Sequence, residues 1–218
     1  MAPRWKKWLS FLTPIVLEQT GSAHNPELSV VLDRGRLQLL SGNAIYSWDD
    51  LYRNFLVAFE QIDIRDKNDQ HVLLLGLGLG SIPFMLEKHF GRRFAYTAVE
   101  HDEAVADLAH RYSLSRLESP VDVVIADAAV FVDLCEETFD LIAIDIFQDD
   151  LVPPAFETPE FLMGCKRLLR PGGTLLYNRL SNHQAQKRQT EVYFQEVFKK
   201  TFPQGRAIDS RGNWVLCS

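Results

Sequence analysis

The segment 71-HVLLLGLGLGS-81 decides the fold of this 218-residue chain. It opens with a continuous apolar run, as expected of a parallel strand that is buried on both faces of a sheet. Gly76, Gly78 and Gly80 follow at alternate positions, and glycines allow backbone N–H groups to approach a ligand closely. A tight strand-to-helix turn that binds nothing would use the same glycines. The segment therefore predicts a strand, a turn and a helix, with a nucleotide-type site as one of two interpretations.

Strand and helix patterns alternate from this segment to the end of the chain. Each predicted strand is a short apolar run, and the residues between strands have apolar positions at helical spacing. Further strands are expected at residues 94–100, 121–127, 139–145, 174–180 and 213–218, with helices at residues 81–90, 102–113, 128–137, 158–169 and 189–202. This alternation predicts a doubly wound, Rossmann-like α/β sheet, which binds its ligands at the carboxyl ends of the strands.

The N-terminal part has a different pattern. Residues 1–19 predict a short amphipathic helix and then a strand, and residues 28–40 predict a small antiparallel sheet. Residues 49–62 have helical spacing, with Asp49 or Asp50 as the helix cap. The expected division is an N-terminal helix and small antiparallel β segment over residues 1–48, and a Rossmann-like domain over residues 49–218.

Composition and charge exclude several classes of function. With a formal net charge of -6 and a pI near 5.5, the chain lacks the basic character that is typical of nucleic-acid binders. No apolar run is long enough to span a bilayer, and the basic and apolar start lacks the small-residue cleavage site of a signal peptide. The three cysteines are isolated, and the histidines lack metal-ligand spacing. We expect a cytoplasmic protein without a nucleic-acid, membrane or metal partner.

Acidic residues stand at the ends of three predicted strands. Glu100 follows Gly76 by 24 positions, near the spacing of about 20 residues at which an acid reaches a ribose diol. Asp127 and Asp145 end the next two strands. Each acid alone is compatible with a simple helix cap. Because the carboxyl ends of parallel strands meet at one edge of a sheet, the glycine turn and the three acids together favour a ligand site.

The loop after Asp145 adds the carboxylates of Asp149 and Asp150, close to Phe147. Three acids and an aromatic ring in so short a stretch favour a pocket for a cation. The alternative is that Asp149 and Asp150 are solvent-exposed turn residues that bind nothing.

Several of these segments together carry a resemblance to a known family. They are VLLLGLGLGS (72–81), YTAVEHDEAV (96–105), VVIADAAVFV (123–132) and FDLIAIDIF (139–147). In this order they resemble the class I fold that binds S-adenosylmethionine and related nucleosides. The segment VVLDRGRLQLLSGNAIYSWDDL (30–51) narrows the resemblance to the spermidine synthase (polyamine aminopropyltransferase) family, within the class I S-adenosylmethionine-dependent methyltransferase fold.

The resemblance implies a nucleoside site. In it, Glu100 binds the ribose hydroxyls, because a carboxylate accepts two hydrogen bonds from a diol. Asp127 accepts from the adenine amino group, the N–H of Ala128 faces the adenine ring, and Gln38 folds over the ribose. The co-substrate is expected to be decarboxylated S-adenosylmethionine or S-adenosylmethionine itself, and no metal is needed.

The resemblance also implies the chemistry at the other end of the site. Asp145 matches the family's catalytic aspartate, which orients an amine nucleophile and takes its proton. Tyr46 is expected beside it, at the reacting centre or on the methylene chain of the amine. The side chains expected to bind the amine substrate are Trp48, Asp49, Asp149 and Asp150.

Two departures from the family pattern leave the reaction open. The aspartate of the family's glycine loop, which holds the aminopropyl amine, is Leu79 here, and the acid that many methyltransferases place before the first glycine is Leu74. The leading prediction is aminopropyl transfer from decarboxylated S-adenosylmethionine to an amine such as putrescine. The alternatives are an S-adenosylmethionine-dependent methyltransferase and a catalytically silent nucleoside-binding protein. The family also implies a homodimer, because its N-terminal hairpin often supports oligomers.

Overall fold

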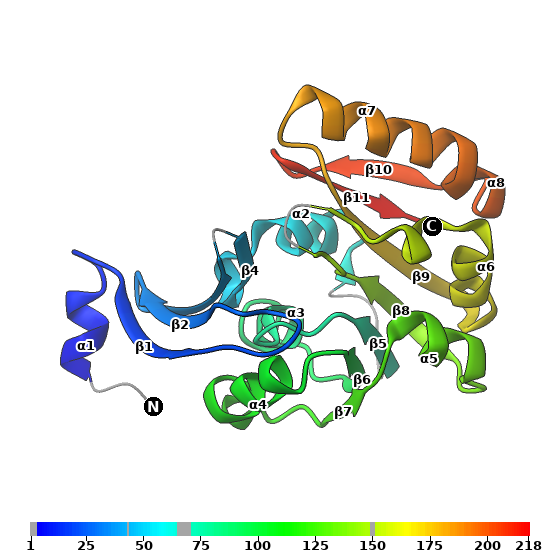
Figure 1. The fold of residues 1–218 in the computed structure, drawn as a ribbon. Helices are drawn as coiled ribbons and strands as arrows, with labels where there is room; N and C mark the ends of the chain where they lie inside the picture. Colours follow the sequence, from blue (N-terminus) through cyan, green and yellow to red (C-terminus); the bar gives the residue numbers. More distant parts are fainter. Residues whose placement is uncertain (1–3, 43, 65–70, 149–150) are drawn as a thin grey trace.

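The computed structural model describes residues 4–42, 44–64, 71–148 and 151–218, and these form two β-sheets (Figure 1). The first sheet follows helix α1 (Arg4–Leu9) and is antiparallel, with its strands in sequence order. Its strands are β1 (Ile15–Thr20), β2 (Leu28–Asp33), β3 (Arg36–Ser41) and β4 (Ala44–Trp48). The predicted N-terminal helix and small β appendage are therefore confirmed.

The second sheet has seven strands in the order β10-β11-β9-β8-β5-β6-β7. They are β5 (His71–Leu75), β6 (Ala95–Glu100), β7 (Val121–Ile125), β8 (Phe139–Ile144), β9 (Leu169–Leu180), β10 (Arg206–Asp209) and β11 (Asn213–Cys217). The strands β5 to β9 are parallel, whereas β11 and β10 add antiparallel at one end. Because the chain builds outward from β5 in both directions, the turn after β5 lies at the switch point where ligands bind in such sheets.

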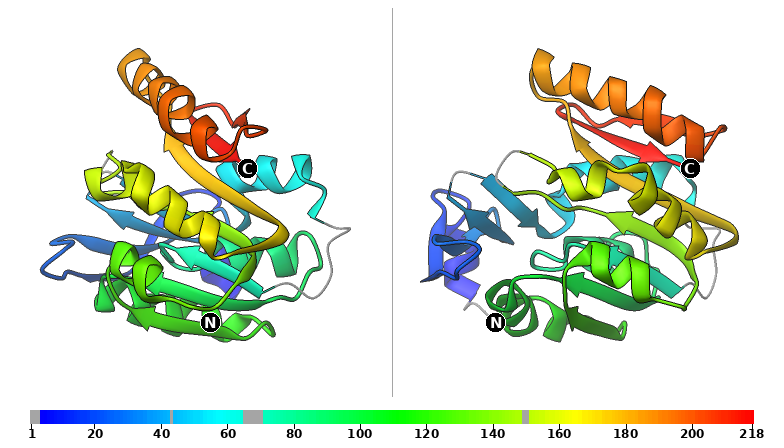
Figure 2. Two further views of the ribbon diagram at one scale, coloured as in Figure 1. Left: turned by 90° about the vertical axis from the view of Figure 1, so that its right-hand side faces the viewer. Right: turned by 45° about the vertical axis from the view of Figure 1, so that its right-hand side comes forward.

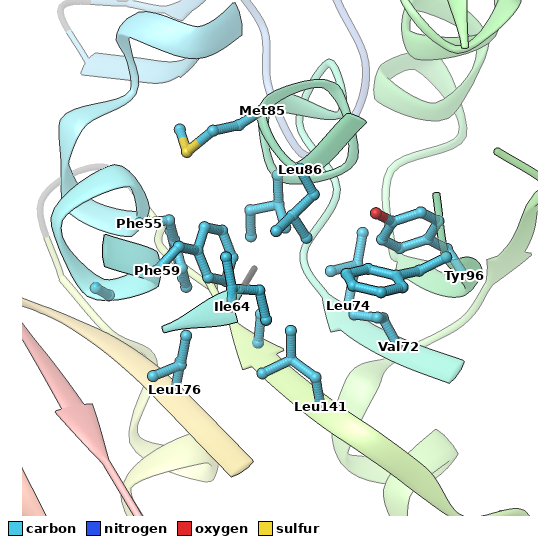
Figure 3. Close-up of a cluster of buried hydrophobic side chains, with 14 of the residues drawn as sticks. Phe55, Phe59, Ile64, Val72, Leu74, Met85, Leu86, Tyr96, Leu141 and Leu176 are labelled. Carbon is cyan, nitrogen blue, oxygen red and sulfur yellow. The ribbon is translucent and has the colours of Figure 1, made fainter. Parts of the chain in front are cut away.

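Helices cover both faces of this sheet, as Figure 2 shows. One face carries α2 (Arg53–Gln61), α3 (Ser81–Lys88) and α4 (Glu103–Tyr112), and the other carries α5 (Ala128–Leu134), α6 (Pro159–Arg167) and α7 (Gln184–Tyr193). The side chains of β5 alternate between the two cores: Val72 and Leu74 pack with α2 and α3 (Figure 3), and Leu73 and Leu75 pack with α5 and α6. Two covered faces explain why β5 is apolar without interruption.

Shorter helical turns complete the fold. A π-helical turn (Phe194–Phe198) and α8 (Lys199–Thr201) extend α7, and 3₁₀ turns lie at Asp49–Leu51, Leu114–Arg116 and Pro154–Glu157. None of the helices within the described ranges is long and apolar enough to cross a membrane.

Two local predictions are wrong. The strand expected at residues 174–180 begins at Leu169 and includes Pro171–Gly173, where the register with β8 shifts. Neither Asp49 nor Asp50 caps α2, because a 3₁₀ turn precedes the helix and its N-cap residue, Tyr52, makes no side-chain capping bond. Instead, Asp50 pairs with Arg36 of β3.

Buried contacts join the two sheets. Asp49 is only 2% exposed, and its carboxylate binds Arg116 (3.2 Å) and accepts from the N–H of Leu37 (3.0 Å). Leu79 of the glycine loop packs in an apolar cluster with β2, β3 and α4, and its N–H donates to Ser47 Oγ of β4 (3.0 Å). The N-terminal sheet is thus held against the loop that follows β5.

Candidate functional site

A cavity of about 1260 Å³ opens at the carboxyl edge of the seven-stranded sheet, bounded on one side by the N-terminal sheet. Its size is sufficient for a nucleoside-sized ligand. From the strand ends it is lined by Gly76, Gly78, Glu100, Asp127, Ala128 and Asp145, and from the N-terminal part by His24, Asn25, Tyr46 and Trp48. Eight residues that were predicted separately for the site therefore meet at one cavity.

The glycine loop is shaped by close backbone packing. Gly76 has φ of +90°, and a Cβ there would lie 2.3 Å from the carbonyl oxygen of Asp145. Gly78 has φ of +53°, and its Cβ would lie 3.2 Å from the carbonyl oxygen of Tyr46. Both conformations favour glycine. These glycines bring the turn after β5 against Asp145, which follows β8, and against Tyr46 of β4.

Gly80 does not line the cavity. It is the N-cap residue of α3, with φ of +79°, and a Cβ there would lie 2.9 Å from the side chain of Leu114. Its role in the described structure is to start the helix, so the structure places it outside the predicted ligand contact.

Glu100 is buried where β6 ends, and it lines the cavity. One carboxylate oxygen accepts from the N–H of Leu77 (3.1 Å), and the other accepts from those of His101 (2.9 Å) and Asp102 (3.1 Å). These three donors fix the carboxylate between the glycine loop and the start of α4. The His101 ring lies 3.2 Å from Glu100, which raises the pKa of His101.

Asp127 is the N-cap of α5, as one interpretation of the sequence had it. Its Oδ1 accepts from the N–H groups of Ala129 (2.8 Å) and Val130 (3.1 Å). No described residue hydrogen-bonds to its Oδ2, and both Asp127 and Ala128 line the cavity. The helix cap therefore uses Oδ1 and does not occupy Oδ2.

Asp145 follows β8 and lines the cavity. Its hydrogen-bond partners are Tyr52, which precedes α2, and Asn178 of β9. Its Oδ1 accepts from Tyr52 Oη (3.1 Å) and from Asn178 Nδ2 (2.8 Å), whereas no described residue hydrogen-bonds to Oδ2. Burial raises the pKa of Asp145 to about 6, and the two hydrogen bonds limit the rise because they favour the charged form. Asn178 is itself fixed by Asn213 Nδ2 (2.9 Å).

Tyr52 and Asn178 were not predicted as site residues. Asn178 is fully buried within the apolar strand β9, and a polar residue in such a strand needs a partner. That signal was available in the sequence TLLYNRL. Tyr52 carried no comparable signal, because its position depends on how α2 approaches β8.

Tyr46 and Trp48 project from β4 into the cavity wall. The Tyr46 hydroxyl donates to Asn25 Oδ1 (2.9 Å), and Asn25 Nδ2 donates to Asp102 Oδ2 (2.6 Å). This chain of bonds orients Tyr46 relative to the start of α4. The Nε1 of Trp48 is buried and has no hydrogen-bond partner among the described residues.

Two other predicted residues do not reach the cavity. Asp49 is engaged by Arg116 and Leu37, so its carboxylate serves the joint between the sheets and not an amine. Gln38 is buried in the middle of β3, where it pairs with Val31 and Trp48 and does not line the cavity. Asp149 and Asp150 lie outside the described residues.

Several lining residues were missed because local sequence patterns do not report which helix ends, loops and strand ends meet at the cavity. They include Arg53, Asn54, Phe156, Asn182 and Asn213, whereas Phe147, which was expected at a cation pocket, also lines the cavity. Near Glu100 the rings of His24 and His101 are in contact, with centroids 4.6 Å apart. Within the described ranges, no group of three histidine, cysteine or acidic side chains converges as a metal site.

The fold and the site define an α/β protein of the class I methyltransferase type, with acids at the strand ends around a nucleoside-sized cavity. A family model described as the spermine/spermidine synthase domain matches residues 50–208. This chain therefore belongs to the spermine/spermidine synthase family.

The similar proteins include an aminopropyltransferase and a methyltransferase. A polyamine aminopropyltransferase of Vibrio vulnificus is 30% identical over 155 residues, which are 68% of this chain and 50% of the relative. An eEF1A lysine and N-terminal methyltransferase of Bos taurus is 28% identical over 156 residues, which are 66% of this chain and 22% of that protein. The chain thus spans half or less of the length of these two relatives.

The fold also matches a solved structure. The spermidine synthase from Thermotoga maritima superposes with a TM-score of 0.69 and 19% identity, over 93% of this chain and 71% of that one. At this level of identity, the comparison supports the fold.

Proposed function

We propose that this protein transfers an aminopropyl group from decarboxylated S-adenosylmethionine to an amine such as putrescine, and releases methylthioadenosine. The observation that carries the proposal is the environment of the Asp145 carboxyl group: its position at the cavity, its hydrogen bonds and its pKa. Its carboxyl borders a nucleoside-sized cavity, two donors occupy one oxygen, and its pKa is raised to about 6. The name of the Vibrio relative, polyamine aminopropyltransferase, supports the same reaction.

The reaction needs a neutral amine. The amine nitrogen attacks the carbon next to the sulfonium sulfur, so that a C–N bond forms and the C–S bond breaks. The electron pair of the C–S bond stays on sulfur, which becomes the thioether of methylthioadenosine. Amine substrates are protonated at neutral pH, so one proton must leave the nitrogen.

Asp145 is suited to that proton transfer. With a pKa of about 6 it is mainly ionised at neutral pH, yet it is more basic than an ordinary aspartate. Tyr52 and Asn178 hold Oδ1, which leaves Oδ2 to orient the attacking nitrogen, accept its proton and pass the proton to solvent. A fixed carboxylate also lowers the entropic cost of aligning the two reactants.

The nucleoside end is assigned to the acids of the two neighbouring strands. Glu100 would accept from the ribose hydroxyls and Asp127 Oδ2 from the adenine amino group, with the N–H of Ala128 facing the ring. Both acids line the cavity, and backbone hydrogen bonds fix both carboxylates before any ligand arrives. Such preorganisation favours binding because little ordering remains to be done.

Methyl transfer from S-adenosylmethionine is the second candidate. It is favoured by the side chains that are available to bind the amino and carboxylate groups at the tail of the co-substrate. Leu79 faces the apolar cluster and not the cavity, and the acids among the described lining residues are Glu100, Asp127 and Asp145. Arg53 lines the same cavity. A guanidinium is a good partner for the carboxylate that only the undecarboxylated co-substrate carries. The bovine relative is named a methyltransferase.

Calorimetric titration with decarboxylated S-adenosylmethionine, S-adenosylmethionine and methylthioadenosine separates these functions. Aminopropyl transfer predicts that the decarboxylated form binds at least about tenfold (~1.4 kcal/mol) more tightly than the carboxylated one. Mass spectrometry should then detect an aminopropylated amine. If the carboxylated form binds as well or better and a methylated product appears, the second candidate is correct. Binding of methylthioadenosine without turnover of any amine would identify a silent nucleoside-binding protein.

Two variants sharpen the titration. Arg53→Gln is expected to leave the affinity for methylthioadenosine unchanged, whether the reaction is aminopropyl or methyl transfer. If Arg53 binds the tail carboxylate, the variant should selectively weaken the binding of S-adenosylmethionine. Asp145→Asn is expected to abolish turnover while methylthioadenosine still binds. Asp133→Asn makes the same chemical change at an exposed position on α5 and serves as the control.

A further inference from the structure

The first described residues form an exposed apolar surface. In α1 no residue is buried, and large apolar side chains face solvent from there to the start of β1. They are Trp5, Trp8, Leu9, Phe11, Leu12 and Val16, and the most exposed are Trp8 at 79% and Leu12 at 85%. We call these six side chains the N-terminal patch. Contiguous exposed apolar surfaces of this kind mark interaction sites.

The N-terminal patch is held in a fixed place on the protein. Ser10 is buried: its Oγ accepts from the N–H of Gly35 (2.9 Å) and donates to the carbonyl oxygen of Lys7 (2.7 Å). Its carbonyl oxygen accepts from the N–H of Arg34 (3.0 Å). The turn between β2 and β3 therefore holds the end of α1 in place, and Figure 1 shows α1 at the outer edge of the molecule.

The helix that carries part of the patch is basic. Arg4, Lys6 and Lys7 lie on α1, and the first acidic residue of the chain is Glu18. The whole chain nevertheless has a formal net charge of -6. A cationic and aromatic surface on an acidic protein restricts the partner, because an anionic surface is attracted here and repelled elsewhere.

A second copy of this chain is a poor occupant for the patch. A two-fold dimer places the same surface of both copies together. A dimer across the patch would therefore bring the basic α1 of both copies into one interface, and residues 4–17 contain no acid. Like charges brought together in this way oppose association.

An anionic lipid surface fits both properties of the patch. Tryptophan rings are favoured at the boundary between head groups and acyl chains, where lysine and arginine side chains meet anionic head groups. We propose that the N-terminal patch docks this protein on anionic bilayers as a peripheral contact. The sequence-based expectation of no membrane partner was drawn from the length of apolar runs, which does not report how residues 5–16 are exposed.

Binding to lipid vesicles tests the proposal. The intact chain should sediment with vesicles of phosphatidylcholine mixed with phosphatidylserine, should bind phosphatidylcholine vesicles much more weakly, and should be released by rising salt. Lys6→Gln/Lys7→Gln should lower the affinity about 25-fold, since each basic residue near an anionic surface contributes about a factor of five. Trp5→Ala/Trp8→Ala should remove most of the binding.

Two controls distinguish docking from a general effect of charge or folding. Lys199→Gln/Lys200→Gln removes two charges from α8, which lies on the far side of the molecule in Figure 1, and should leave vesicle binding unchanged. The unfolding temperature of the α1 variants should stay that of the parent protein, because α1 buries no side chain.

Three results would overturn the proposal. They are the absence of binding to the anionic vesicles, equal binding of both vesicle types, and a dimer in sedimentation equilibrium that the α1 variants dissociate. The last result would mean that a second copy covers the patch.

Discussion

Replacing Asp145 by asparagine should make the ligand-free protein more stable at neutral pH while it removes catalysis. The asparagine Oδ1 can keep both hydrogen bonds, from Tyr52 and from Asn178, because both donors bind the same oxygen of Asp145. What the substitution removes is a carboxylate that must ionise in a buried place. The proton acceptor is lost too, so turnover should fall by about two to four orders of magnitude.

The size of the stability effect follows from the pKa of Asp145. Folding raises it from 3.8 to about 6, so the folded state binds the proton more tightly than the unfolded state does. Folding stability is therefore lost as the pH rises from about 4 through about 6, and the loss is complete above that range. A rise of this size corresponds to roughly 3 kcal/mol.

Urea unfolding of the parent protein and of Asp145→Asn across this range checks the reasoning. The difference in unfolding free energy between the two should be small near pH 4, grow through pH 6 and level off at roughly 3 kcal/mol in favour of the variant. All other titrating groups are shared, so their contributions cancel. A difference that is constant with pH, or a variant that is less stable at neutral pH, would refute the assignment of Asp145 as a buried, raised carboxyl.

Three further substitutions probe the neighbouring groups. Asn178→Ala removes a hydrogen bond that favours the ionised form of Asp145, so the acidic limb of the kcat/KM profile should move to higher pH. Asp127→Asn keeps the helix cap on Oδ1, so the unfolding temperature should stay unchanged. The affinity for methylthioadenosine, measured by calorimetry, should fall about tenfold. Asp49→Ala leaves Arg116 without its partner and should cost about 3 kcal/mol in urea unfolding, with normal affinity for methylthioadenosine.

The main sheet could be predicted because most of its strands are short, mainly apolar runs. Strands with helices on both faces are mainly apolar, and β5 and β8 follow this pattern except at His71 and Asp140. The strand β10 was missed, since its four residues include Arg206 and Asp209 and it pairs only at the edge of the sheet. The extension of β9 was missed because prolines and glycines are usually read as breaks.

The site could be predicted only in part, because strand order places some of its residues and tertiary packing places the others. Glu100, Asp127 and Asp145 follow successive parallel strands, so topology alone brings them to one edge of the sheet. The partners of Asp145 depend on the packing of α2 and β9, which local patterns do not report. Asp49 was assigned to the amine because of its charge, but a left-handed backbone conformation (φ 34°) and Arg116 direct it elsewhere.

The position of Leu79 limits which side chains the glycine loop can carry. Its side chain is 1% exposed and fastens the N-terminal sheet to the glycine loop and α4. An aspartate here would bury a carboxylate among leucines and valines, at a cost of several kcal/mol. Introducing an acid at this position would therefore require the joint between the sheets to be rebuilt first, so the architecture of this protein constrains the chemistry that its glycine loop can offer a ligand.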